Sequence, residues 1–284
     1  MKPFGIAGMQ LSLSKTESNL DKMHHKLGEL IARFPWVQMV VFSELAAFGP
    51  HTKFAQALPG PAESTFQAWA KEFDIWLIPG SIFEAADGGI YNTTPIINPQ
   101  GEVIDRYRKQ FPFQPHESGI AKGDRFVVFD VPEVGRFGVS ICYDMWFPET
   151  TRSMVALGAE VIIHPTFTDT LDRQAELSIA RATAAMNQCF VFDVNGLGDC
   201  GNGQSCVIAP SGLALHQSGT IEDIFPLELN LEQVRHEREH GIIGGLGQVL
   251  KSFRDRAVDF DVYDKTKAQP YLDSLGKLEW SRRS

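Results

Sequence analysis

Positive charge, cysteine and long apolar segments are all scarce in this chain of 284 residues. Lys and Arg together number 26 against 35 Asp and Glu, which gives a formal net charge of −9. Nucleic acids and anionic membrane surfaces attract basic patches, so an acidic chain without a basic block is not expected to bind either. No apolar run reaches the length of a membrane span, so we expect no transmembrane helix.

The four cysteines are Cys142, Cys189, Cys200 and Cys206. They form no C-x-x-C pair and have no His at ligand spacing among them, so we expect no metal site and no cofactor. Residues 1–13 are too short and too mixed in polarity for a signal peptide. We therefore expect a cytoplasmic protein whose thiols stay reduced.

Strand-like and helix-like segments alternate along the chain, and no long Gly/Ser/Pro linker divides them. Helices are predicted over 19–34, 62–73, 149–157 and 171–187. Strands are predicted over 4–9, 37–42, 75–82, 92–97, 103–108, 125–131, 137–142, 161–164, 190–195, 205–209 and 213–216. This alternation predicts an α/β domain with mixed sheet covered by helices. The weakly periodic segment after residue 260 is interpreted as an arm.

Three chemically active side chains stand at the ends of predicted strands. Glu44 follows the apolar strand over 37–42, Lys109 follows the strand over 103–108, and Cys142 ends the strand over 137–142. A charge at the end of a buried segment is costly unless it is paired or used, and ligand sites in open α/β folds gather at strand ends. We therefore hypothesise that the three side chains converge.

Together these residue types suit nucleophilic catalysis. Glu44 can take the thiol proton and return it to a leaving amine, while the thiolate of Cys142 attacks a carbonyl or nitrile carbon. Lys109 and the backbone N–H groups after Cys142 can hold the developing oxyanion. A nearby lysine and a helix N-terminus are also expected to favour the thiolate. Taken singly, each residue is more typical of an ordinary role: a buried thiol, a turn carboxylate or a solvated lysine.

The order and surroundings of these residues resemble the nitrilase (carbon–nitrogen hydrolase) superfamily. The motifs are Phe-Ser-Glu ending at Glu44, Tyr-Arg-Lys ending at Lys109, and Cys-Tyr-Asp-x-x-Phe-Pro-Glu starting at Cys142. Asn-Pro-x-Gly at 98–101 and His-Pro at 164–165 are similar to the family as well, so the resemblance runs from about residue 4 to about residue 260. It implies a Glu–Lys–Cys site on a four-layer α-β-β-α sandwich, with two mixed β-sheets inside and helices outside.

The resemblance also implies a second glutamate between the lysine and the cysteine. Glu117 stands eight residues after Lys109 (117 − 109), an offset similar to that of the amidase members. We assign it to orienting the substrate or sharing a hydrogen bond with Lys109, and its alternative is an ordinary loop carboxylate.

The domain boundaries follow from the same resemblance. Residues 1–262 are interpreted as the carbon–nitrogen hydrolase domain and residues 263–284 as a C-terminal arm. The apolar residues of this arm predict a homodimer or a higher homo-oligomer that uses it. They are Tyr263, Tyr271, Leu272, Leu275, Leu278 and Trp280.

The residues just after the cysteine bear on the substrate. Family members that hydrolyse carbamoyl amino acids have two basic residues there, whereas this chain has Met145 and Trp146, which cannot grip a carboxylate. Tyr143, Trp146 and Phe167 are expected to line an apolar, aromatic substrate pocket. We expect hydrolysis of a small neutral carboxamide or carbamoyl compound, with release of ammonia or an amine.

Three alternatives stay open from the sequence. The same residues would suit a nitrilase acting on a small nitrile. They would also suit a non-catalytic member of the family that binds a metabolite. A cysteine hydrolase of the papain type needs a catalytic histidine after the cysteine, and His164 is the nearest candidate. Its position before Pro165 at a strand end is also similar to the family, so we interpret His164 as structural.

Overall fold

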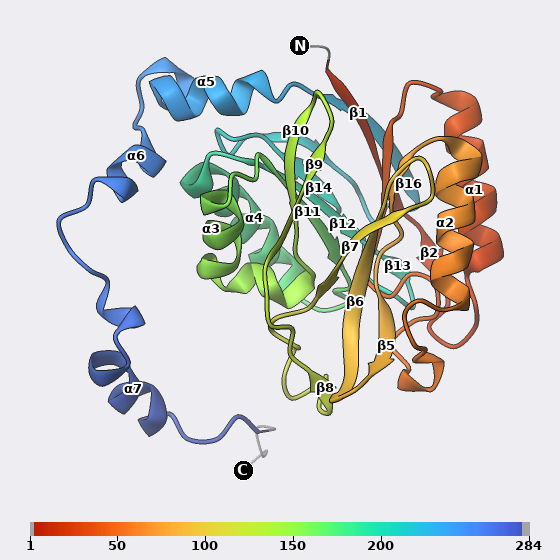
Figure 1. The fold of residues 1–284 in the computed structure, drawn as a ribbon, viewed down its shortest axis with the longest axis horizontal. Helices are drawn as coiled ribbons and strands as arrows, with labels where there is room; N and C mark the ends of the chain where they lie inside the picture. The colour runs from red at the N-terminus through yellow and green to blue at the C-terminus, as the bar shows by residue number, and fades with distance from the viewer. Residues whose placement is uncertain (1–2, 280–284) are drawn as a thin grey trace.

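The computed structural model of the protein describes residues 3–279. In it, two β-sheets pack face to face, and helices cover the outer side of each sheet (Figure 1). One apolar core lies between the sheets, and a second and a third lie between each sheet and its helices. This arrangement confirms the predicted four-layer α-β-β-α sandwich.

The first sheet runs in the order β16-β1-β3-β4-β6-β5, with β7 and β8 also paired to β6. Its strands are β1 (Phe4–Gln10), β3 (Met39–Phe42), β4 (Trp76–Ile78), β5 (Ile82–Ala86), β6 (Gly89–Ile97), β7 (Val103–Arg108), β8 (Ile120–Ala121) and β16 (Asp223–Leu229). The sheet is mixed, because β1 pairs parallel with β3 and antiparallel with β16.

The second sheet runs in the order β15-β14-β12-β11-β10-β9. Its strands are β9 (Val127–Val131), β10 (Gly135–Val139), β11 (Val161–Thr166), β12 (Phe190–Asn195), β14 (Cys206–Ile208) and β15 (Ala214–Gln217). It is also mixed, since β10, β11 and β12 are parallel and β9 is antiparallel to β10. The short strands β2 (Ser12–Leu13) and β13 (Leu197–Gly198) form a separate pair.

The helices cover the sheets in two pairs (Figure 1). They are α1 (Leu20–Arg33) and α2 (Pro61–Phe73) on the first sheet, and α3 (Pro148–Ala156) and α4 (Asp172–Asn187) on the second. Helix α1 shows why the pattern predicts this placement: Met23, Leu27 and Leu30, spaced three to four residues apart, are its buried residues. Between the sheets, the rings of Phe4 and Phe137 meet edge to face with centroids 5.5 Å apart.

The structure departs from the predicted strands at two points that matter for the site. The strand predicted over 75–82 is two strands, because the chain bends between them at Gly80, whose φ is +80°. A Cβ there would lie 1.9 Å from the carbonyl oxygen of Ser43, so only glycine fits. The strand predicted over 137–142 ends at Val139, and Cys142 begins a 3₁₀-helix, η2 (Cys142–Trp146). Strands β5 and β16 lie largely outside the predicted segments.

The chain after β16 leads along one side of the sandwich and then away from it (Figure 1). This part contains α5 (Glu232–His240), η3 (Ile242–Gly244), α6 (Val249–Arg254), η4 (Asp261–Tyr263) and α7 (Lys265–Ser274); a further short 3₁₀-helix, η1 (Thr52–Phe54), precedes α2. Helix α7 has no buried residue, and Tyr271 and Leu275 are more than half exposed. Trp280 lies outside the described residues. Of the helices in residues 3–279, none has the length and apolar character needed to cross a membrane.

Candidate active site

The sequence-predicted residues Glu44, Lys109, Glu117 and Cys142 line one cavity of about 560 Å³. Glu44 follows β3 of the first sheet, and Cys142 follows β10 of the second. The two sheets are joined at this edge by a hydrogen bond from the backbone N–H of Glu44 to the carbonyl oxygen of Thr166, at 3.2 Å. The cavity therefore lies where strand ends of both sheets meet.

Lys109 forms the centre of the buried charges. Its Nζ donates to Oε1 of Glu44 and to Oε2 of Glu117, both at 2.8 Å. Lys109 and Glu44 are each 2% exposed, so their charges are compensated by each other rather than by water. The structure thus brings together a cation and two carboxylates that stand far apart in the sequence.

Asn92 on β6 completes this group, although nothing in the sequence singles it out as a functional residue. Its Nδ2 donates to Glu44 at 2.7 Å and to Glu117 at 3.2 Å. It also accepts, through its backbone carbonyl, the N–H of Lys109 at 2.9 Å. The only signal in the sequence is an asparagine inside a predicted strand, because strands are depleted in this residue.

The loop that carries Glu117 is fixed by the same carboxylate. Oε2 of Glu117 accepts the backbone N–H of Phe113 at 2.5 Å, and the N–H of Glu117 donates to the carbonyl of Phe113 at 2.7 Å. Since Lys109 binds the same oxygen, this loop is held against the lysine. A solvated loop carboxylate would not make these contacts.

Cys142 has a backbone conformation that is unusual for a side-chain-bearing residue. Its φ is +48°, in the left-handed region, at the first position of η2. The Sγ lies 3.7 Å from the carbonyl oxygen of Phe167, and the residue is 9% exposed. The sharp turn directs the thiol toward the cavity instead of along the strand, so this position is a turn and not the end of β10.

The electrostatics keep this thiol protonated at rest. Burial raises the pKa of Cys142 well above its ordinary value, the charge of Glu44 raises it further, and Lys109 only partly opposes them. The expectation of an easily ionised thiol is therefore wrong, although Lys109 does favour the thiolate as predicted. Burial likewise raises the pKa of Glu44, which gives it more affinity for a proton.

Lys109 is charged in this environment. Burial alone would lower its pKa, but the carboxylates of Glu44 and Glu117 hold the pKa well above its ordinary value. The pKa of Glu117 is lowered: burial opposes the shift, and Lys109 outweighs it. The site therefore presents a permanent cation beside a carboxylate able to accept a proton.

His164 has partners other than Cys142. Its Nδ1 lies 2.8 Å from Oγ of Ser140, and its Nε2 lies 3.8 Å from Asp193. Burial lowers its pKa to about 4, so the ring is neutral at neutral pH. A papain-type pair of Cys142 and His164 is therefore not the arrangement in this structure.

Aromatic side chains contribute to the lining of the cavity. The three predicted substrate-binding residues, Tyr143, Trp146 and Phe167, all line it. The ring of Tyr143 lies 6.0 Å from that of Trp146 and 4.9 Å from that of Phe113, centroid to centroid. Phe113 is a further lining residue that the sequence did not single out.

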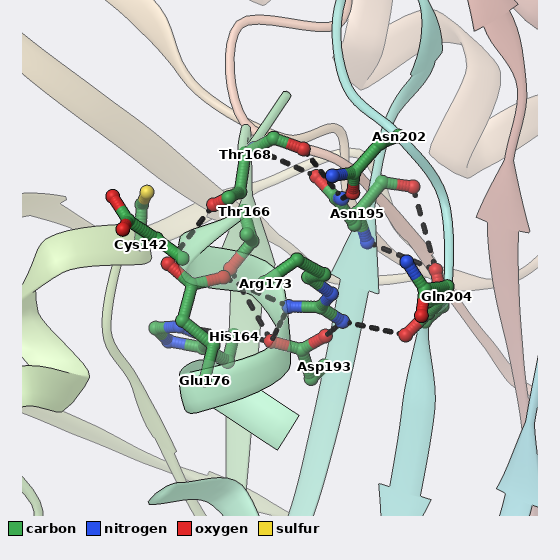
Figure 2. Close-up of polar contacts among 12 residues, drawn as sticks. Cys142, His164, Thr166, Thr168, Arg173, Glu176, Asp193, Asn195, Asn202 and Gln204 are labelled. Carbon is green, nitrogen blue, oxygen red and sulfur yellow. Dashed lines mark hydrogen bonds and ion pairs between the residues drawn. The ribbon is translucent and has the colours of Figure 1, made fainter. Parts of the chain in front are cut away.

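A polar cluster lies behind the cavity and contains residues that sequence reasoning missed (Figure 2). Glu176 on α4 lines the cavity, and its Oε2 accepts from Arg173 at 3.2 Å. Arg173 also forms an ion pair with Asp193 on β12. Thr168 donates to Oε1 of Glu176 at 2.9 Å. Arg173 and Glu176 are three residues apart on a helix, which alone suggests only a surface ion pair.

The four cysteines are free and buried, including Cys189, Cys200 and Cys206. Residues 3–279 contain no group of three or more His, Cys, Asp or Glu side chains placed to hold a metal ion.

Comparisons with known proteins point to one family. The carbon-nitrogen hydrolase family model matches residues 5–239. An omega-amidase of Xenopus laevis is 30% identical over 260 residues, covering 84% of this chain and 93% of the relative. A formamidase of Bacillus cereus is 31% identical over 192 residues, covering 64% of this chain and 58% of the relative. The crystal structure of Saccharomyces cerevisiae Nit3, a member of the nitrilase superfamily, matches with a TM-score of 0.78 at 27% identity, covering 87% of this chain and 96% of Nit3.

Proposed function

The chain belongs to the carbon-nitrogen hydrolase family, and we propose that it hydrolyses the C–N bond of a small carboxamide or carbamoyl compound through a thioester on Cys142. The observation that carries this proposal is the position of Lys109, 2.8 Å from both Glu44 and Glu117, in the cavity that the Cys142 thiol also lines. The similarity to an omega-amidase and a formamidase supports an amide as the substrate.

In the first half-reaction, Glu44 takes the proton of the Cys142 thiol as Sγ attacks the amide carbon. The carbonyl becomes an oxyanion, which Lys109 and the backbone N–H groups after Cys142 stabilise. Glu44 then gives its proton to the leaving nitrogen, the C–N bond breaks, and ammonia or an amine departs. A thioester joins the acyl group to Cys142.

In the second half-reaction, a water molecule replaces the amine. Glu44 takes a proton from this water as its oxygen attacks the thioester carbon, and Lys109 again faces the oxyanion. The C–S bond breaks, the acid leaves, and the proton returns to the sulfur. The raised pKa values of Cys142 and Glu44 support this assignment, because a protonated thiol needs a base and Glu44 has the affinity to serve as one.

We assign Glu117 to positioning. It shares Lys109 with Glu44 and is held by Phe113 and Asn92, so it aims the ammonium while it fixes the loop beside the substrate.

The carboxamide class is supported by the positions after the nucleophile. Met145 and Trp146 have no guanidinium group, and no Arg is among the described residues that line the cavity. The carboxylate of an anionic substrate would therefore find no guanidinium to bind it there. The neutral amides predicted from the sequence fit this condition.

We also propose that residues 1–262 form the catalytic domain and that residues 263–284 lie in the interface of a homodimer or higher homo-oligomer. The exposed apolar side chains of the described part of this arm support the assignment. A cytoplasmic location remains a prediction, supported by four buried cysteines in the free form.

The test is ammonia release from a panel of small amides and nitriles, with wild type, Cys142→Ala and Cys189→Ala. Cys189 is a matched buried thiol outside the lining of the cavity. We expect hydrolysis of amides by wild type and Cys189→Ala, an acyl adduct on Cys142 by mass spectrometry, and no hydrolysis by Cys142→Ala. Full activity of Cys142→Ala would rule out the mechanism. Turnover of nitriles in place of amides would make the protein a nitrilase, and tight binding without an adduct would make it a binding protein.

A further inference from the structure

We propose that the preferred substrate carries an ammonium group in addition to its amide, and that Glu176 is the residue that selects it. This inference rests on the proposed hydrolysis, and it replaces the neutral amide expected from the sequence with a cationic one as the preferred substrate. Among amides without a carboxylate, it separates cationic from uncharged ones.

The charges around the cavity are the first observation. Five carboxylates line it, and Lys109 is the only Lys or Arg among the described residues that do so. The carboxylates belong to Glu44, Glu117, Asp169, Asp172 and Glu176. Lys109 is already shared between two of them, so the remaining negative charge faces the cavity. Such a cavity attracts a cationic ligand and repels an anionic one.

Glu176 is the carboxylate best placed to meet that ligand. Its partner Arg173 also binds Asp193, so a single guanidinium serves two carboxylates and the three groups keep a net negative charge. Arg173 and Asp193 are each 1% exposed and sealed behind the cavity, whereas Glu176 lines it. In Figure 2 the Glu176 carboxylate lies between Arg173 and Cys142. The excess negative charge of this group therefore lies at Glu176, on the side of the cavity that carries Cys142.

The aromatic side chains of the lining supply the second half of an ammonium site. Nε1 of Trp146 lies 3.5 Å from Oε1 of Glu176, so an indole ring borders the carboxylate. Trp146 is 36% exposed, and the ring of Tyr143 stands next to it. An ammonium group placed here gains the attraction of the aromatic faces together with the carboxylate.

The competing interpretation is purely structural: Glu176 would only connect α4 to Thr168. In that case the charge of the substrate would not matter to a variant that keeps the shape. Glu176→Gln keeps the length and the acceptor for Thr168 but loses the charge, so it separates the two interpretations. Asp21→Asn, in the first turn of α1 on the outside of the first sheet, is the matched control for loss of one negative charge.

The experiment measures kcat/KM for ammonia release near neutral pH from three amides of similar size: 4-aminobutanamide, which is cationic, pentanamide, which is neutral, and succinamate, which is anionic. We expect wild type and Asp21→Asn to prefer them in that order. In Glu176→Gln the ratio of the cationic to the neutral amide should fall about tenfold. A preference of wild type for succinamate, or an unchanged ratio in Glu176→Gln, would overturn the inference, and the wild-type order decides the matter if that variant does not fold.

A binding measurement separates this inference from the proposed hydrolysis. The cationic and the neutral amide are compared as protectants of Cys142 against alkylation by iodoacetamide, which needs no turnover. If no amide is hydrolysed but 4-aminobutanamide protects at about tenfold lower concentration than pentanamide in wild type only, the hydrolysis proposal fails and the ammonium site stands. If all three amides are hydrolysed without charge preference, the hydrolysis proposal stands and the ammonium site fails. Equal protection by both amides in wild type also overturns the ammonium site.

Discussion

The Tyr107 hydroxyl donates a hydrogen bond to Oδ2 of Asp144 at 2.7 Å, and this buried contact connects the strand that leads to Lys109 with the turn that carries Cys142. Oδ1 of the same carboxylate accepts the backbone N–H groups of Gln110 at 3.1 Å and Phe111 at 2.9 Å. Oδ2 also accepts the N–H of Ile141 at 3.0 Å. Asp144 is therefore a positioning residue, which fixes Cys142, the proposed nucleophile, relative to Lys109, the proposed oxyanion donor.

Replacing this carboxylate by an amide tests the positioning role. Asp144→Asn keeps one acceptor oxygen, so some of the four donors face an NH₂ group and remain unsatisfied. We expect the free energy of unfolding to fall by about 1–3 kcal/mol and kcat to fall with little change in KM. Urea denaturation and ammonia-release kinetics measure the two effects.

Tyr107→Phe is the control, because it removes one donor and leaves the three backbone contacts. Its loss of stability should be the smaller, about 1 kcal/mol. Full kcat in Asp144→Asn would show that Asp144 stabilises the fold without positioning the two catalytic side chains.

The raised pKa of the Cys142 thiol predicts how the rate of its alkylation depends on pH. Because burial and Glu44 favour the thiol, the rate of alkylation by iodoacetamide should keep rising above the ordinary thiol pKa of about 8.5, without an earlier plateau. Glu44→Gln removes a negative neighbour, so the midpoint of alkylation should move to lower pH while hydrolysis falls about 10²–10⁴-fold. Mass spectrometry of the labelled Cys142 peptide gives the midpoint.

Misfolding should expose the thiol without regard to charge. It would therefore not account for a lower alkylation midpoint together with slower hydrolysis in Glu44→Gln. Lys109→Met is the sign control, since loss of the cation should move the midpoint to higher pH. A midpoint that rises in Glu44→Gln would contradict the assignment of Glu44 as an ionised neighbour of the thiol.

The buried His164 predicts a loss of stability in acid. Its pKa is about 4 because of burial, below the ordinary 6.5, so the unfolded chain takes up a proton first as the pH falls. This group should therefore lower the free energy of unfolding progressively between about pH 6.5 and pH 4, by about 3 kcal/mol in total. Chemical denaturation across this range measures the slope.

His164→Asn removes that titration and is expected to flatten the slope. Asp144, whose pKa is raised by burial from 3.8 to about 6, acts with the opposite sign: its burial costs stability as the pH rises from about 3.8 to about 6. Because Asp144 is present in both proteins, its contribution cancels in the comparison. Identical slopes for wild type and variant would refute the assignment to His164.

Removal of residues 263–284 tests the role of the arm. If this segment lies in an oligomer interface, light scattering should show fewer chains per oligomer for the truncated protein than for the full chain. Leu215→Ser, at an exposed apolar position on β15, is a control that leaves the arm intact. An unchanged number of chains per particle after truncation would place the interface elsewhere.

How far the sequence predicts the site differs from residue to residue. Glu44, Lys109 and Cys142 can be found because they follow apolar strands and stand in an ordered set of motifs. Glu117 is implied by the family resemblance, because its offset to Lys109 is similar to that of the amidase members. Asn92 and Glu176 cannot be found this way. Asn92 contacts Glu44, 48 residues away, and Glu176 contacts Trp146, 30 residues away, and nothing in a local pattern marks such contacts.

Periodicity, a local property of the chain, is enough to predict the alternation of strands and helices. The family resemblance carried by short motifs implies the four-layer fold and Cys142 as the proposed nucleophile. The protonation of that nucleophile and the charge of its cavity emerge only from the three-dimensional packing. Burial and the approach of Glu44 keep Cys142 a thiol, and the packing of α4 onto the second sheet brings Glu176 to the cavity. Both depend on distances between segments remote in sequence, which only the packing of the two sheets fixes.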